Sequence, residues 1–101
     1  MISVLAFITV KAGKRAEFIE AFKANVPNVL AEDGCIEYAP TVDVKPALPR
    51  QEVDDNSVTI IEKWDSGEAL QAHLQAPHML AFREKAVDLV EGTTIKVLQE
   101  A

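Results

Sequence analysis

The sequence contains a single cysteine, Cys35, so it can form no internal disulfide and no zinc site built on paired cysteines. Basic residues are also scarce, because ten Lys and Arg stand against 16 Asp and Glu and leave a formal net charge of -6. Clustered Lys and Arg bind phosphate backbones, so we expect no nucleic-acid partner. No apolar run approaches the roughly 20 residues that span a bilayer, and no basic stretch precedes Ile2. We therefore expect no membrane association and a cytoplasmic location.

The length and composition are those of one ordinary globular domain. A chain of 101 residues can close one hydrophobic core but is too short for two. Hydrophobic residues make up 49% and charged residues 26%, which excludes a disordered or fibrous chain. We expect a single domain over residues 1–101.

The first segment, Ile2–Val10, alternates as a strand does and is apolar on both faces. Ile2, Val4, Ala6, Ile8 and Val10 share one face, and Leu5 and Phe7 lie on the other. Both faces of this strand therefore need cover.

From Lys14 the apolar residues recur at steps of three and four, which predicts an amphipathic helix that ends at Gly34. Its buried side is expected to carry Ile19, Phe22, Val26 and Val29. Pro27 lies inside this helix, where it removes a backbone donor, so we expect a bend or short break near Asn25.

The later segments complete an α+β domain. They are a strand over 35–44, a loop over Lys45–Asn56, a strand over 57–64, a helix over 67–75 capped by Ser66, a helix from Pro77 to Val90 stopped by Gly92, and a strand over 93–98. The order β-α-β-β-α-α-β is that of a ferredoxin-like split βαβ unit, an antiparallel sheet with its helices on one face. The other sheet face would be covered in a homodimer. A monomer with a polar open face is the alternative.

Two segments, Glu32 to Tyr38 and Glu62 to His78, resemble a known family, the antibiotic biosynthesis monooxygenase domain. That family's pattern has an acid-x-Gly-Cys turn leading to Tyr, a strand-ending Glu-x-Trp, an Ala-x3-His helix, and a second His after a short break. The positions that fill this pattern are Glu32, Gly34, Cys35, Tyr38, Glu62, Trp64, Ala69, His73 and His78.

The resemblance implies a dimeric α+β barrel in which each subunit holds a pocket between its helices and its sheet. The family includes cofactor-free oxygenases of quinols and anthrones, haem-degrading enzymes, an isomerase of a phosphorylated signalling sugar derivative, and members of unknown role. Haem degradation uses an Asn on the first strand, and Ile2–Val10 contains none. The Lys45–Asn56 connection is longer than is usual in the family and could lie over the pocket mouth.

Oxygenation without metal or flavin needs a substrate that reduces dioxygen once it is deprotonated, together with a base and a dry pocket. The candidate bases are His73 and His78. The candidate substrate-binding residues are Trp64, Tyr38, Phe82 and Phe7. Pro77 lies between the two histidines, which also lack the i, i+4 spacing of helical metal ligands, so we expect no metal site.

Each of these residues also has a purely structural interpretation. His73 could be a core histidine, and His78 a surface residue that begins a helix. Trp64 could simply fill the core, and Tyr38 could pack with a solvated hydroxyl. Cys35 is expected to be a small buried side chain rather than a nucleophile.

The sequence therefore predicts a cofactor-independent monooxygenase that oxidises a quinol- or anthrone-like small aromatic molecule with dioxygen. An isomerase or tautomerase of a small carbonyl compound is the alternative, and dioxygen uptake separates the two. A third possibility is a non-catalytic dimeric ligand-binding or stress-response domain. In that case, replacing both histidines by Gln would leave ligand affinity nearly intact.

Overall fold

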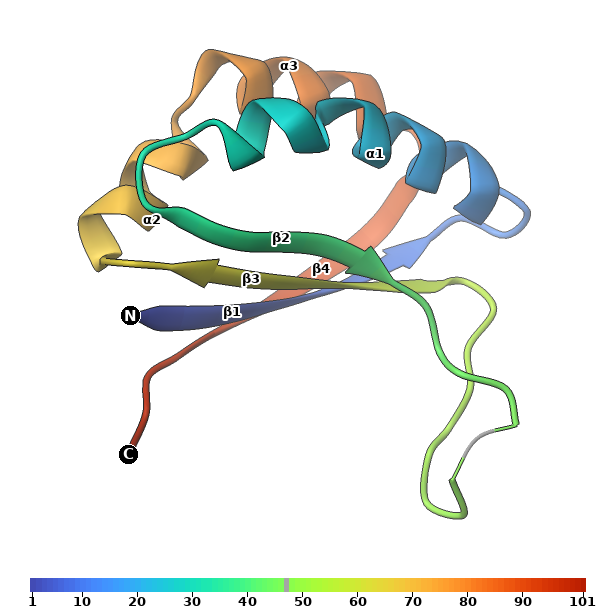
Figure 1. The fold of residues 1–101 in the computed structure, drawn as a ribbon. Helices are drawn as coiled ribbons and strands as arrows, with labels where there is room; N and C mark the ends of the chain where they lie inside the picture. Colours follow the sequence, from blue (N-terminus) through green and yellow to red (C-terminus); the bar gives the residue numbers. More distant parts are fainter. Residues whose placement is uncertain (47) are drawn as a thin grey trace.

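The computed structural model describes residues 1–46 and 48–101 and has the expected order of elements. Residue 47, within the predicted Lys45–Asn56 loop, lies outside the described residues. Figure 1 shows a curved sheet with all its helices on one side. The elements are β1 (Ile2–Val10), α1 (Arg15–Leu30), β2 (Cys35–Thr41), β3 (Ser57–Trp64), α2 (Gly67–Leu74), α3 (Pro77–Ala86) and β4 (Val90–Leu98). No helix in the described ranges is both long and apolar enough to cross a membrane.

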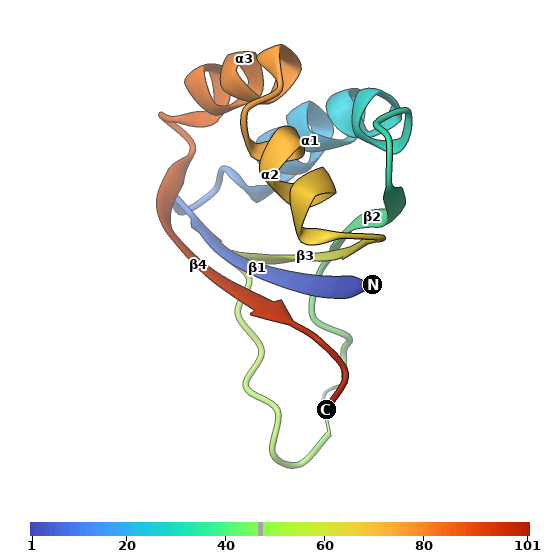
Figure 2. The ribbon, with the colours of Figure 1, turned by 90° about the vertical axis from the view of Figure 1, so that its left-hand side faces the viewer.

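The four strands form one antiparallel sheet in the order β2-β3-β1-β4. This is the ferredoxin-like arrangement predicted from the order of elements, and it places β1 and β3 at the centre and β4 at an edge. Figure 2 shows α1, α2 and α3 covering the same face of this sheet. The α+β prediction is therefore confirmed.

The core lies between the helices and the sheet face that they cover. From the sheet it contains Val4, Ala6 and Val10 of β1 and Val58 and Ile60 of β3, all at most 6% exposed. From α1 it contains Phe18, Phe22 and Val29. The alternation predicted for β1 is thus correct, since one face packs against the helices.

The short break predicted near Asn25 does not occur in α1, and the helix ends before Gly34. α1 continues through Pro27 to Leu30, and the backbone N–H of Ala31 still donates to the carbonyl of Pro27 at 3.2 Å. The residues past the proline thus keep enough helical bonding to hold the helix together. Gly34 lies in the turn before β2, with a φ of 84°.

The last helix is shorter than predicted, because the chain pairs with β1 before it reaches Gly92. The backbone N–H of Lys11 donates to the carbonyl of Leu89 at 2.9 Å, and Val90 is already paired with Val10. α3 therefore ends at Ala86, and Gly92 lies inside β4. At the other end of the sheet, β2 stops at Thr41 instead of continuing to Val44.

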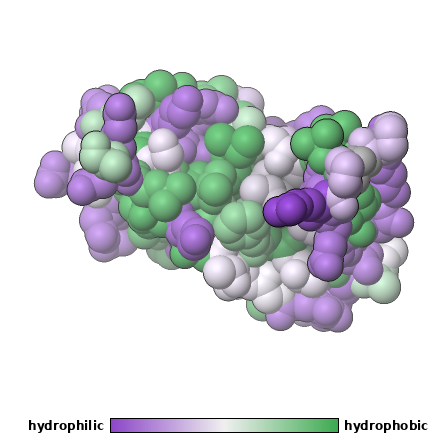
Figure 3. Space-filling model, turned by 90° about the horizontal axis from the view of Figure 1, so that it is seen from below, coloured by the Kyte–Doolittle hydropathy of each residue, from purple (hydrophilic) through white to green (hydrophobic). Residues whose placement is uncertain are grey.

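The sheet face opposite the helices is uncovered. Leu5 and Phe7 of β1 lie on it, with Ile61 paired to Leu5, and Phe7 is 40% exposed. Figure 3 views this face and shows apolar side chains gathered near its centre. We call this surface the uncovered face.

The connection between β2 and β3 projects away from the helices, on the side of the uncovered face (Figures 1 and 2). The expectation that it lies over the pocket mouth is therefore wrong. The hairpin leaves the sheet beyond Thr41, so its direction follows the strand ends rather than the helix layer. Val44 and Leu48 of this loop are 70% and 77% exposed.

Candidate active site

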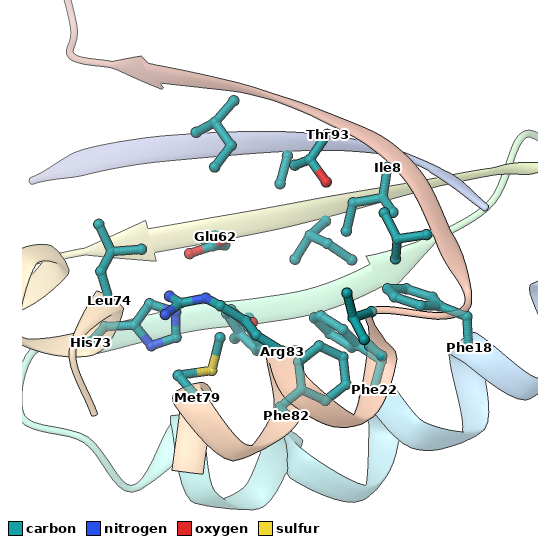
Figure 4. Close-up of a pocket in the computed structure, with 17 residues that line it drawn as sticks. Ile8, Phe18, Phe22, Glu62, His73, Leu74, Met79, Phe82, Arg83 and Thr93 are labelled. Carbon is teal, nitrogen blue, oxygen red and sulfur yellow. The ribbon is translucent and has the colours of Figure 1, made fainter. Parts of the chain in front are cut away.

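A cavity of about 430 Å³ lies between the sheet and the helices (Figure 4). The sheet supplies Ala6, Ile8, Tyr38, Ile60, Glu62, Thr93 and Ile95, with Val90 at the start of β4. The helices supply Phe18, Phe22, His73, Leu74, Met79, Phe82, Arg83 and Ala86, followed by Val87. Most of these side chains are apolar, so the cavity suits a small aromatic molecule more than a polar one.

Four aromatic rings form one wall of the cavity. Phe22 of α1 stacks on Tyr38 of β2, with ring centroids 5.1 Å apart and an interplanar angle of 13°. Phe82 of α3 meets Phe22 edge-on at 5.6 Å and Phe18 at 6.1 Å. These packed rings hold the wall in a fixed shape, which favours a flat ligand.

His73 lies at one end of the cavity and is only 2% exposed. It belongs to α2, which begins where the Ser66 hydroxyl accepts a hydrogen bond from the backbone N–H of Ala69 at 3.1 Å. Its Nδ1 atom lies 2.9 Å from Oε2 of Glu32. Since a carboxylate only accepts hydrogen bonds, Nδ1 carries the proton of the neutral ring, and Nε2 is left to accept one.

His78 lies outside this cavity and contacts the same carboxylate of Glu32. It follows Pro77 in the first turn of α3, as predicted, and borders a shallow groove against α1. Its Nε2 lies 3.0 Å from the same Oε2 of Glu32, within ion-pair distance. The approach is poorly aligned, however, and neither ring nitrogen has a hydrogen bond of good geometry among the described residues. Of the two candidate bases, only His73 lines the cavity.

Glu62 places a second titratable group in the cavity. Its side chain is 7% exposed, and its Oε1 accepts a hydrogen bond from Nε1 of Trp64 at 3.0 Å. Burial raises the pKa of this carboxyl, while the Trp64 hydrogen bond and the nearby His73 act in the opposite direction and Glu32 adds to the rise. Figure 4 shows Glu62, His73 and Arg83 around the same end of the cavity.

Two further polar residues, Tyr38 and Arg83, line the cavity together with His73 and Glu62. Tyr38 is 7% exposed, and burial, with the charges of Glu62 and Glu32, raises the pKa of its phenol well above the ordinary value. It therefore remains a neutral donor. Arg83 lines the cavity from α3 and remains exposed at its rim.

Trp64 and Phe7 do not line the cavity. Trp64 is fully buried, with its ring 4.6 Å from that of His73, so it supports the histidine from behind, as the core-filling interpretation predicts. Phe7 lies on the uncovered face because it alternates with Ala6, which lines the cavity. The structure therefore places Phe7 on the wrong side of the sheet to reach a ligand held there.

Several residues of the site were not predicted from the sequence. Glu32 and Glu62 belong to the segments that resemble the family but were assigned no chemistry, and Arg83 gave no signal. Phe18 could have been found, since it precedes Phe22 by four residues and both lie on one face of α1.

Burial raises the pKa of the Cys35 thiol, and the charges of Glu32 and Glu62 add to this. Its thiolate is therefore disfavoured, in keeping with a structural role. Among residues 1–46 and 48–101, no three His, Cys, Asp or Glu side chains are grouped so as to hold a metal ion.

Fold and site together define a small α+β domain with an aromatic-walled cavity and a histidine and a carboxyl at one end. The family model for "Antibiotic biosynthesis monooxygenase" matches residues 1–85. The chain therefore belongs to the antibiotic biosynthesis monooxygenase family.

Two bacterial proteins illustrate the relationship. "Probable quinol monooxygenase YgiN" of Escherichia coli K12 is 39% identical over 101 residues, covering 98% of this chain and 97% of that protein. "Putative monooxygenase YcnE" of Bacillus subtilis is 29% identical, covering 91% and 88%. A solved structure, "Putative antibiotic biosynthesis monooxygenase from Nitrosomonas europaea", has a TM-score of 0.82 at 19% identity, covering 99% of this chain and 98% of that one, which shows the shared fold.

Proposed function

We propose that the protein is a cofactor-independent monooxygenase that oxidises a quinol- or anthrone-like small aromatic molecule with dioxygen. The observation that carries this proposal is the buried His73, held by Glu32 at the end of an aromatic-walled cavity of about 430 Å³. The name of the Escherichia coli relative, a quinol monooxygenase, supports the same class of substrate.

The chemistry needs only groups that the cavity contains. Nε2 of His73 takes a proton from the substrate, and the resulting anion is electron-rich enough to reduce dioxygen and form a carbon–oxygen bond. The hydroperoxide then loses the remaining hydrogen of that carbon as a proton, and its O–O bond breaks. One oxygen atom stays as a carbonyl or hydroxyl oxygen and the other leaves as water, with the protons returned by His73.

Glu62 is suited to assist the second step. A carboxyl whose pKa is raised by burial holds its proton to higher pH than an ordinary glutamate does. It can therefore donate a proton to the departing oxygen while His73 acts as the base. Tyr38, neutral and buried, can donate a hydrogen bond to a substrate oxygen.

A homodimer formed through the uncovered face belongs to the same proposal. Leu5, Phe7 and Ile61 lie at its centre, and a two-fold arrangement would bury the same apolar patch from both copies. The cavity lies on the other side of the sheet, so each subunit would keep its own site. The expectation of a cytoplasmic location remains a prediction.

The experiment is oxygen consumption by purified, metal-stripped protein with a panel of hydroquinones and anthrones. We expect catalysed uptake in the wild type and a loss of about 100- to 10,000-fold in kcat for His73→Gln, the usual contribution of a general base. Lys85→Gln, an exposed change on the far side of α3, is the matched control and should retain full activity. If the wild type shows no uptake above the uncatalysed rate, the oxygenase proposal is wrong.

The same panel distinguishes the alternatives. An isomerase would convert a carbonyl substrate without consuming oxygen and would still need His73. A binding domain would retain ligand affinity in His73→Gln and convert nothing.

A further inference from the structure

The floor of the cavity continues beyond the helices that cover it. Along β4, the side chains that face the helices are Thr93, Ile95 and Val97, since strand residues alternate between faces. Thr93 and Ile95 line the cavity, yet Ile95 and Val97 are each 55% exposed. Because β4 is an edge strand, an apolar strip runs from inside the cavity to the rim of the sheet.

The pairing of the strands joins this strip to the reactive end of the cavity. Val4 of β1 is paired with Glu62 on one side and with Val97 on the other. Ala6, one step along the same face, is paired with Ile95. A ring held against Glu62 and His73 would therefore lie about 10 Å from the apolar strip, which is two strands away across the sheet.

The opposite rim of the opening is also partly apolar. Val87, at the end of α3, is 64% exposed, and Leu74, at the end of α2, is 37% exposed, although both line the cavity. The stem of Arg83 lies on the same rim and can cover an apolar group while its charged end stays in water. The opening between α3 and β4 thus offers apolar contacts on both sides.

We infer that the substrate ring carries an alkyl or isoprenoid chain, and that this chain leaves the cavity between α3 and β4 over Ile95 and Val97. The inference rests on the proposed function, since it places the ring at His73. Single exposed apolar residues are ordinary on a protein surface. Ile95 and Val97 are distinguished by their continuity with the cavity, and they lie on the sheet face opposite the proposed dimer interface.

The test measures anaerobic binding of two quinones by calorimetry, so it does not depend on turnover. The probes are 2-methyl-1,4-naphthoquinone and the same ring carrying a ten-carbon alkyl chain, both below the concentration at which the longer one aggregates. We expect the chain to lower the Kd about 10- to 100-fold, which is the gain from burying two or three methylene groups. Val97→Ser, a change outside the cavity lining, should lose most of this gain while binding the short probe within about twofold of the wild type.

Leu80→Ser is the matched control, because Leu80 is 55% exposed on α3 and lies outside the cavity lining. It should keep the full gain. Binding of the ring with no gain from the chain would overturn the inference and leave the proposed function standing. An equal gain from the chain in the Val97 and Leu80 variants would do the same. A wild type that binds neither probe would overturn both. Protection, in the dimer without ligand, of those β4 amides that are not hydrogen-bonded to β1 would show that a second copy covers the strip and would also overturn the inference.

Discussion

Replacing Gly34 by alanine should destabilise the protein far more than the same change at Gly13. Both glycines have a positive φ, 84° and 77°, which costs a side-chain-bearing residue about 1–2 kcal/mol. A Cβ at Gly13 would meet no atom within 4 Å. At Gly34 it would lie 2.5 Å from Oδ1 of Asp65 and 2.7 Å from Cβ of Ala69, so the start of α2 would have to move.

The overpacking at Gly34 adds about 1–3 kcal/mol, giving a total of about 2–5 kcal/mol for Gly34→Ala against about 1–2 kcal/mol for Gly13→Ala. For a domain of this size each kcal/mol lowers Tm by about 4–8 °C. Urea unfolding and thermal scans of both variants provide the comparison. Equal losses at the two positions would refute the account of how this turn packs against the helix that carries His73.

Three further predictions concern the site and the uncovered face. Burial raises the pKa of Glu62 above 4.5, so the folded protein loses stability relative to the unfolded chain as the pH rises past that value. Glu62→Gln should therefore be more stable than the wild type at pH 7 but not at pH 4. An equal difference at both pH values would contradict this. Phe7→Asp should raise the Kd of the proposed dimer at least about 100-fold by burying an unpaired carboxylate, and light scattering that still shows dimers at low micromolar concentration would argue against the interface. Glu32→Gln should lower kcat about 10- to 100-fold, because His73 would lose the carboxylate that keeps its proton on Nδ1. Asp33→Asn, the same charge change at an exposed neighbouring residue, should leave kcat unchanged. A comparable loss in both variants would show that only net charge matters.

The order and type of every element could be predicted from the sequence because the local patterns agree with the tertiary contacts. Ser57–Trp64 and Gly67–Leu74 are examples, one with a run of β-branched residues and the other with a serine cap. Boundaries failed where tertiary contacts outweighed local signals. Pro27 was tolerated within α1, and Val90 paired with β1 before Gly92 could act as a stop.

The candidate site was only partly predictable, since residue type does not give the direction of a side chain. His73 and His78 looked alike as bases, and only the fold shows that His73 lines the cavity while His78 lies outside it and contacts Glu32. Trp64 seemed a pocket wall but packs behind His73. The pairing of Glu32 with His73 joins residues 41 positions apart, a contact that no local pattern indicates.

The most direct test of the central claim is the fate of oxygen-18 in a single reaction. Metal-stripped protein is supplied with a naphthoquinol or an anthrone under ¹⁸O₂, and the product is examined by mass spectrometry together with an assay for hydrogen peroxide. The account predicts one labelled oxygen atom in each product molecule, no peroxide, and loss of both product and oxygen uptake in His73→Gln. Unlabelled product with one peroxide per turnover would contradict it, because the protein would then be oxidising its substrate without inserting oxygen.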